Sequence, residues 1–263
     1  KRASEMTDLA ALAKAAEQTD GSLLGTFTGE DLVETFAPYF MPDIIKDKQL
    51  DTEKLRTVLQ ELQTIAAHCD MVEKYKKGER ASNEWDLPSA MQAVLCQISG
   101  FNDAMFDLAI INLVKGDYTS FENAYIPTVE IGVNANTKQA DLAKEFAAFV
   151  MSREVQDGDF YDGFPVNKES LHMQGSLDRS DYAAYTTIEG ADGQEIGLDI
   201  EPIKAADADK LEALCDSLSK KTVKDAKVLE ELKKSVPDYL LGRQSLDDTI
   251  SKIQDGVKIY LAE

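Results

Sequence analysis

Apolar residues alternate with polar residues and glycine over residues 129–134. Val129, Ile131 and Val133 are separated by a glutamate and a glycine. A period of two predicts a β-strand, because successive side chains of a strand point to opposite sides of the sheet. We therefore expect one face of this strand to be buried.

The period changes to that of a helix immediately afterwards. Leu142, Phe146 and Phe149, followed by Val150, have the spacing of one apolar stripe, and Thr137 or Asp141 could provide the N-cap oxygen. We expect this stripe to face a core. A loop containing glycine and proline follows at residues 163–167.

Other apolar stripes predict helices on both sides of this unit. Asp51 is a plausible N-cap for a helix whose Leu55, Val58, Leu59, Leu62 and Ile65 share one face, and Ser245 fits a capping box before the last helix. Pro237 should end the helix before it. The predicted helices cover about 6–18, 30–37, 51–65, 142–150, 207–219, 222–235 and 246–260. Residues 106–114 could form a further, buried helix, which periodicity alone does not distinguish from a strand.

Two other segments read as strands. Residues 185–188 and 196–200 are short alternating runs on either side of a turn from Gly190 to Gly193, which predicts a β-hairpin. Residues 91–98 could form a short buried strand, although periodicity alone does not distinguish this from a helix. The pattern as a whole predicts an α/β protein.

The composition excludes some partners. The chain has 263 residues, of which 43% are hydrophobic, so it can bury a core of substantial size. Its formal net charge is −20, and such a field repels phosphate backbones and anionic lipids. We expect neither nucleic acid nor a membrane surface as a direct partner.

Residues typical of catalysis are scarce. His68 and His172 are the only histidines, and no common hydrolase, zinc-protease or nucleotide-binding motif is present. Asp157, Asp159 and Asp162 lie close together, but their spacing does not fit a calcium loop, since a tyrosine takes the fifth position. We expect no enzyme activity, no metal and no cofactor.

The three cysteines leave their pairing open. Cys69, Cys96 and Cys215 are too few for a disulfide framework, although one pair and one free thiol are possible. Cys215 lies on an apolar helical face, where a cysteine behaves as a small hydrophobic residue.

Six segments carry a resemblance through their order along the chain: Thr7–Ala13, Leu50–Leu62, Tyr125–Thr137, Ala143–Phe146, Gly163–Asn167 and Tyr260–Glu263. This order resembles the C-terminal half of an extracellular solute-binding protein of an ABC importer, in the family that includes sugar-binding lipoproteins. The resemblance implies a periplasmic-binding-protein-like fold of type II. It also implies that the chain is mainly the helix-rich C-terminal lobe, with the N-terminal lobe largely missing.

The resemblance also implies a division of the chain. Residues 1–85 and 129–263 would belong to the C-terminal lobe, and residues 86–128 would belong to or face the N-terminal lobe, with hinge crossings near 83–88 and 125–131. The whole protein would be an extracellular lipoprotein anchored to the membrane, or a periplasmic protein. Its export signal and lipid-attachment cysteine would precede Lys1. It would be a monomer that delivers its solute to permease subunits.

A carbohydrate, most simply an oligosaccharide, is the expected solute. An aromatic ring can stack on the C–H face of a sugar while neighbouring polar groups bind its hydroxyls. Aromatic and polar residues near the expected hinges are the candidate ligand-binding residues: Trp85, Phe101, Asn102, Tyr125, Tyr161 and Asp162.

Three alternatives remain open at this stage. A binding protein of this kind could hold a peptide or a polyamine in place of a sugar. A non-enzymatic helical module that binds another protein would present a contiguous exposed apolar patch. A hydrolase would need two carboxylates facing each other in a pocket, which sequence order cannot place.

Overall fold

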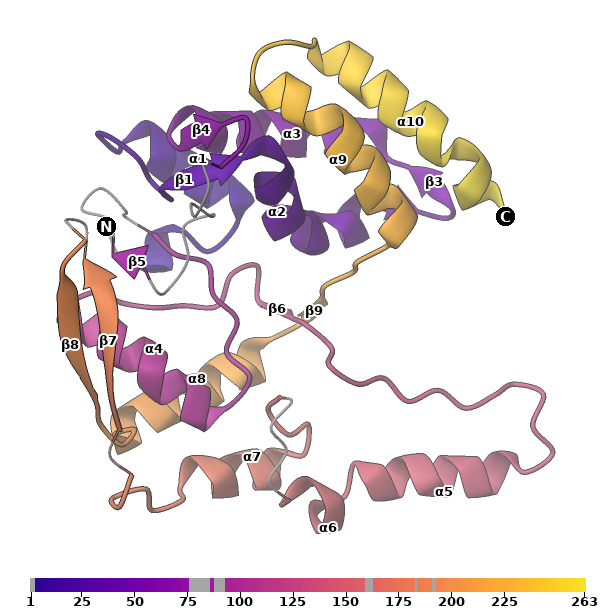
Figure 1. Ribbon diagram of the computed structural model, residues 1–263. Coiled ribbons are helices and arrows are strands. Elements are labelled where there is room, and N and C mark those ends of the chain that lie inside the picture. The colour runs from indigo at the N-terminus through magenta and orange to yellow at the C-terminus, as the bar shows by residue number, and fades with distance from the viewer. Residues whose placement is uncertain (1–2, 76–85, 88–92, 159–162, 183, 191–192) are drawn as a thin grey trace.

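The computed structural model describes residues 3–75, 86–87, 93–158, 163–182, 184–190 and 193–263. It is an α/β structure, rich in helix, with small sheets. Figure 1 shows two groups of elements, one above the other, joined by thin connections. We call the upper group the helical body and the lower group the mixed body.

The helical body is built from both ends of the chain. Its long helices are α1 (Leu9–Glu17), α2 (Gly29–Ile44), α3 (Thr52–Ala67), α9 (Ala226–Leu240) and α10 (Leu246–Ala262). Short strands join or border them: β1 (Thr26–Thr28) pairs in parallel with β4 (Asp70–Val72), and β2 (Ile45–Lys46) pairs antiparallel with β3 (Gln49–Leu50). A short 3₁₀ turn, Ala3–Glu5, precedes α1.

The apolar stripes of these helices meet in one core. The five stripe residues predicted for α3, from Leu55 to Ile65, are all buried there, together with Ile250, Ile253 and Val257 of α10. The predicted caps are confirmed: the Asp51 carboxylate accepts a hydrogen bond from the Lys54 N–H, and the Ser245 hydroxyl accepts one from the Asp248 N–H. Burial of each large side chain contributes about 1.5–3 kcal/mol, so this body is well stabilised.

The prediction that a helix ends before Pro237 is wrong. Pro237 lies inside α9, which continues to Leu240. The proline packs against Gly29 at the start of α2, and a Cβ placed on Gly29 would come within 2.8 Å of the Pro237 Cα. Close packing of α2 on α9 therefore holds the proline within the helix despite the hydrogen bond it removes.

The mixed body has a hairpin packed on helices. Its elements are α4 (Phe101–Leu113), α7 (Lys168–Gly175), α8 (Ala205–Ser217), β5 (Asp86–Leu87), β7 (Ala184–Gly190) and β8 (Glu195–Ile200). The sheet order is β5-β7-β8, and β7 and β8 form the predicted antiparallel hairpin. One small core lies between α4, α7 and α8, and another between α4 and the hairpin.

The expected lobe boundaries stay a prediction, and the packing of the described residues divides the chain differently. Phe101 and Leu108 of α4 share a core with Leu171 of α7 and Leu211 of α8. The main contacts of each body are internal. The described part of the chain is thus two separately packed units.

Two parallel two-residue strands connect the bodies, and we call this pair the neck. It consists of β6 (Ala124–Tyr125) and β9 (Lys220–Lys221), with Ala124 opposite Lys220 and Tyr125 opposite Lys221. Figure 1 places the neck between the upper and lower groups.

Residues 126–156 form what we call the arm. An extended segment, 126–139, leads from the neck to α5 (Ala140–Val150) and then to the short α6 (Arg153–Gln156). Figure 1 shows α5 at the edge of the molecule, away from both cores. The predicted strand over 129–133 is wrong, because these residues have no strand partner in the structure. Likewise, residues 93–98 of the segment 91–98 form no strand.

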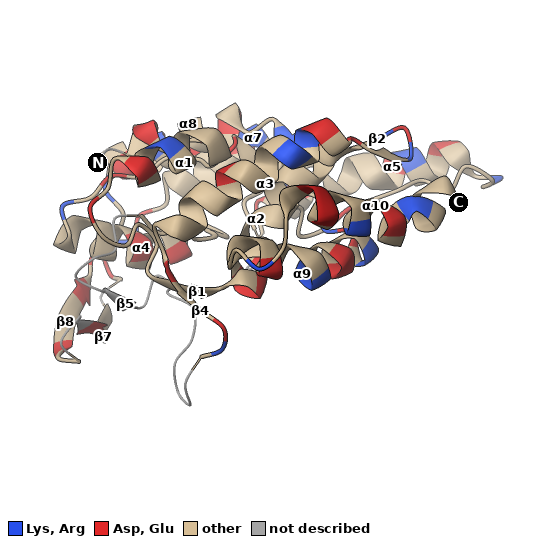
Figure 2. Cartoon of the chain, turned by 90° about the horizontal axis from the view of Figure 1, so that it is seen from above, with Lys and Arg blue, Asp and Glu red and all other residues tan. Residues whose placement is uncertain are grey.

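Charged residues are distributed over most helices in Figure 2, and the β7–β8 hairpin carries acidic residues. The cations of α9 are paired: Lys227 and Lys234 bind Glu230 and Glu231, and Lys233 binds Glu30 and Glu34 of α2. Within the described ranges, no helix is long and apolar enough to cross a membrane.

Candidate functional site

The first candidate residues lie at the start of α4. Phe101 is 2% exposed, and its ring meets the ring of Phe164 edge-on at a centroid distance of 5.3 Å. The Arg179 guanidinium lies 5.6 Å from the Phe101 ring centre, and Arg179 Nε donates a hydrogen bond of 3.0 Å to Asn102 Oδ1. Phe101 is therefore a core residue whose ring is already covered, while Asn102 is exposed.

Tyr125 lies in the neck. Its side chain is 41% exposed, and its carbonyl oxygen accepts a hydrogen bond of 2.9 Å from the Thr222 N–H. The backbone is thus fixed while the ring can be reached from solvent. A ring at the connection between two bodies is well placed to contact a ligand held between them.

The remaining candidates, Trp85, Tyr161 and Asp162, lie outside the described residues. The structure therefore brings together Phe101 and Asn102 at one end of α4, and it places Tyr125 separately in the neck. Phe101, Asn102 and Tyr125 therefore come from two different elements and do not form one cluster.

A charged cluster at the neck was not found from the sequence. The Lys220 ammonium donates to Asp43 Oδ2 at 2.7 Å and to Glu122 Oε2 at 3.0 Å. Burial alone would lower the pKa of Lys220, but the hydrogen bonds to the two carboxylates outweigh it and the pKa is raised. The three residues are far apart in sequence and belong to no local motif, so only the fold reveals the cluster.

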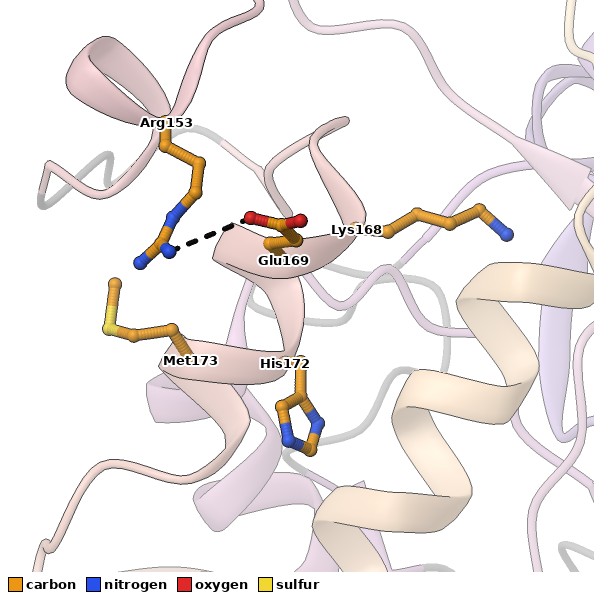
Figure 3. Close-up of a pocket in the computed structure, with 5 residues that line it drawn as sticks. All are labelled: Arg153, Lys168, Glu169, His172 and Met173. Carbon is orange, nitrogen blue, oxygen red and sulfur yellow. Dashed lines mark ion pairs between the residues drawn. The ribbon is translucent and has the colours of Figure 1, made fainter.

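A surface depression lies between α6 and α7 (Figure 3). It has a volume of about 500 Å³ and is lined by Arg153, Lys168, Glu169, His172 and Met173. Its two cations face carboxylates: Arg153 lies 3.6 Å from Glu169 and Lys168 lies 2.7 Å from Asp216. The Nδ1 atom of His172 lies 3.0 Å from the Glu212 carboxylate. The lining has no phenylalanine, tyrosine or tryptophan ring on which a sugar could stack, so it does not fit the expected ligand.

Asp157, one of the three acids considered for calcium, is engaged elsewhere. Its carboxylate accepts hydrogen bonds from the Ser170 hydroxyl at 2.6 Å and from Arg153 Nη2 at 2.9 Å. These hydrogen bonds lower the pKa of Asp157. Among the described residues, no group of three or more metal-ligating side chains could hold a metal ion.

The cysteines form no disulfide in the structure. Burial raises the pKa of the Cys69 thiol to about 12 and that of the Cys215 thiol to about 11. The prediction that Cys215 packs as a small hydrophobic residue agrees with its position beside the core of α4, α7 and α8.

The apolar surface of the arm is the largest departure from the predictions. The stripe of α5 was expected to face a core, yet Leu142 and Phe146 are each 62% exposed and no residue of α5 is buried. Val129, Ile131 and Val133 are exposed as well. Helix periodicity correctly predicted an apolar face, but the described chain supplies nothing to cover it. An exposed apolar helix face of this kind can serve as a docking face.

No family model matches the sequence, and no curated protein matches it significantly. The case for function therefore depends on the geometry described above and on the resemblance carried by the six sequence segments.

Proposed function

We propose that this chain belongs to the solute-binding component of an ABC importer that captures an extracellular carbohydrate. The fold would be periplasmic-binding-protein-like, of type II, and the described residues would form mainly its C-terminal lobe. The observation that carries the proposal is the division into two separately packed bodies joined at a neck. Such a construction permits closure about a hinge.

The mechanism requires no covalent chemistry. A sugar held between the two lobes of the whole protein favours the closed state to the extent that it binds that state more tightly than the open one. The closed form would then be recognised by the permease subunits. Tyr125 would contribute an aromatic face at the hinge, since its ring is exposed while its backbone is fixed. The whole protein would be an extracellular lipoprotein or a periplasmic protein.

The exposed arm supports a further part of the proposal. Leu142, Phe146 and Phe149 present an apolar face that a further lobe could cover. A cleft that needs this lobe would lack about half of its ligand contacts in the present chain alone. We therefore expect weak or undetectable affinity of this chain for any sugar, and micromolar binding in calorimetry would contradict that expectation.

The test of function uses the whole protein in which this chain occurs. A thermal-shift screen against oligosaccharides, peptides and polyamines should give the largest stabilisation with one oligosaccharide, because bound ligand stabilises the folded state. Tyr125→Ala should then reduce the affinity for that sugar about tenfold in calorimetry, a loss expected when an aromatic contact is removed. Tyr185→Ala is the matched control, since Tyr185 is an exposed tyrosine on the hairpin.

Three results would count against a sugar-binding protein. Stabilisation by a peptide or polyamine alone would indicate a different solute. Equal affinity of the Tyr125→Ala and Tyr185→Ala variants for the sugar would show that Tyr125 does not contribute to the binding site. Turnover of any substrate would show that the protein is an enzyme.

The arm favours a second candidate function, that of a non-enzymatic module that binds another protein. Its exposed apolar face is the feature this alternative requires. Hydrogen exchange of α5 in the whole protein separates the two proposals. Protection of α5 without any partner fits the solute-binding protein, whereas protection that develops only when another protein is added fits the interaction module.

A further inference from the structure

The neck has little backbone pairing of its own. The N–H groups of Ser219 and Lys220 donate to the Asn123 carbonyl at 2.8 Å and 3.1 Å, and the Thr222 N–H donates to the Tyr125 carbonyl at 2.9 Å. Strands of two residues are too short to resist bending by themselves. Additional contacts are needed to hold the two bodies at one angle.

The Lys220 side chain supplies such contacts. Its ammonium binds Asp43 at the end of α2 and Glu122 in the turn before β6. The side chains of Lys220 and Glu122 are only 20% and 21% exposed, so solvent screens this pair less than a surface ion pair. One cation thus ties together three chain segments.

Glu122 is itself fixed to the helical body. Its N–H donates to the Thr7 carbonyl at 2.6 Å, and its carboxylate accepts a hydrogen bond of 3.3 Å from the Leu9 N–H at the start of α1. Glu122 and Asn123 have positive φ angles of 59° and 47°. Non-glycine residues adopt this left-handed region only when the surrounding contacts hold them there.

We propose that Lys220 is a positioning residue that locks the neck and sets the angle between the helical body and the mixed body. Without its ammonium, Asp43 and Glu122 would face each other as like charges, and Lys220 would lose its side-chain contacts with Asp43 and Glu122. The bodies would then sample a wider range of angles while each core stayed folded. This role does not depend on which solute or partner the protein binds.

The test compares Lys220→Met with Lys221→Met in the same chain. Lys221 is the next residue of β9 and pairs with Glu130 at the surface, so its substitution changes the net charge equally without touching the cluster. In hydrogen exchange, the amides of Ser219 and Thr222 should exchange about tenfold faster in Lys220→Met than in Lys221→Met, because hydrogen bonds to charged groups are among the stronger ones. The amides of α3 and α4 should be unchanged.

Small-angle X-ray scattering gives a second measurement. The radius of gyration should rise in Lys220→Met and not in Lys221→Met. Glu122→Gln leaves one carboxylate beside Lys220 and should give an intermediate effect, which keeps the test usable if Lys220→Met folds poorly.

Equal exchange at the neck in the two lysine variants would overturn the proposal. So would a uniform loss of protection across α3 and α4 in both Lys220→Met and Glu122→Gln, because that would assign the cluster to the stability of the cores. Both measurements are made without ligand, whereas the proposed function is tested by the thermal-shift screen, so failure of the one is distinguishable from failure of the other.

Discussion

Two phenylalanines in this chain differ in burial, and the same substitution at each tests the structure. Phe101 is buried in the mixed body, whereas Phe146 is 62% exposed on α5. Replacing a buried phenylalanine by alanine costs about 3–5 kcal/mol, which includes the cavity left behind. Phe146 is a little over one third buried, so Phe146→Ala should cost only roughly 0.5–1 kcal/mol.

The assay is urea unfolding of the chain, followed by far-ultraviolet circular dichroism, with the midpoint and slope fitted for each variant. Phe101→Ala should lower the midpoint strongly, and hydrogen exchange should show the loss in α4 and α7. Phe146→Ala should leave both cores protected. If Phe146→Ala destabilised the chain as much as Phe101→Ala, α5 would be packed in solution, and the description of the arm as an exposed face would be refuted.

Two further predictions concern ionisable groups. At about pH 8 a thiol reagent should modify the exposed Cys96 before Cys69. The reason is that the pKa of Cys69 is about 12, so only on the order of one in ten thousand Cys69 thiols is ionised at that pH. Equal modification rates of Cys96 and Cys69 in the folded chain would contradict the burial of Cys69. The Asp157 pKa is lowered from 3.8 in the folded chain by Ser170 and Arg153, so its carboxylate stabilises the fold above that value and the contribution is lost as the pH falls through the folded pKa. Asp157→Asn should accordingly lower the melting temperature at about pH 6, and the difference from the unchanged chain should shrink as the pH falls below 3.8 and through the lowered pKa. A difference independent of pH would contradict the assigned hydrogen bonds.

Local signals in the sequence predicted much of the helical body. Asp51 and Ser245 were recognisable as caps, and the α3 stripe from Leu55 to Ile65 was correctly assigned to a core. These features succeed because a cap and a helical face are properties of a few neighbouring residues. The hairpin of residues 184–200 was found for the same reason, since its turn and its alternation are both local.

The arm and the neck show where local patterns stop being sufficient. The alternation at Val129, Ile131 and Val133 describes side chains that could cover a sheet, but it does not supply a neighbouring strand. The helical period likewise predicted that Phe146 lies on an apolar face, but it could not predict which residues pack against that face. The cluster of Lys220 with Asp43 and Glu122 joins residues separated by 177 and 98 positions, a relation that no spacing rule detects.

The candidate site was anticipated only as separate residues. Aromatic and polar character near the expected hinges singled out Phe101, Asn102 and Tyr125, of which Tyr125 does lie at the connection between the bodies. Phe101 instead fills a core, because burying a large aromatic ring stabilises the folded chain more than leaving the ring exposed at the surface. Composition cannot distinguish these two uses of the same side chain.

The way in which the helical body is assembled has a consequence for synthesis of the chain. Helices α1–α3 come from the first 67 residues, whereas α9 and α10 come from the last 38, and both sets share one core. A ribosome releases the chain from its N-terminus, so this core cannot be completed until α9 and α10 have been synthesised. The mixed body ends with α8 at Ser217 and can fold earlier. During this interval the first three helices expose the apolar faces that α9 and α10 later cover, which is the stage at which the nascent chain would most need a chaperone.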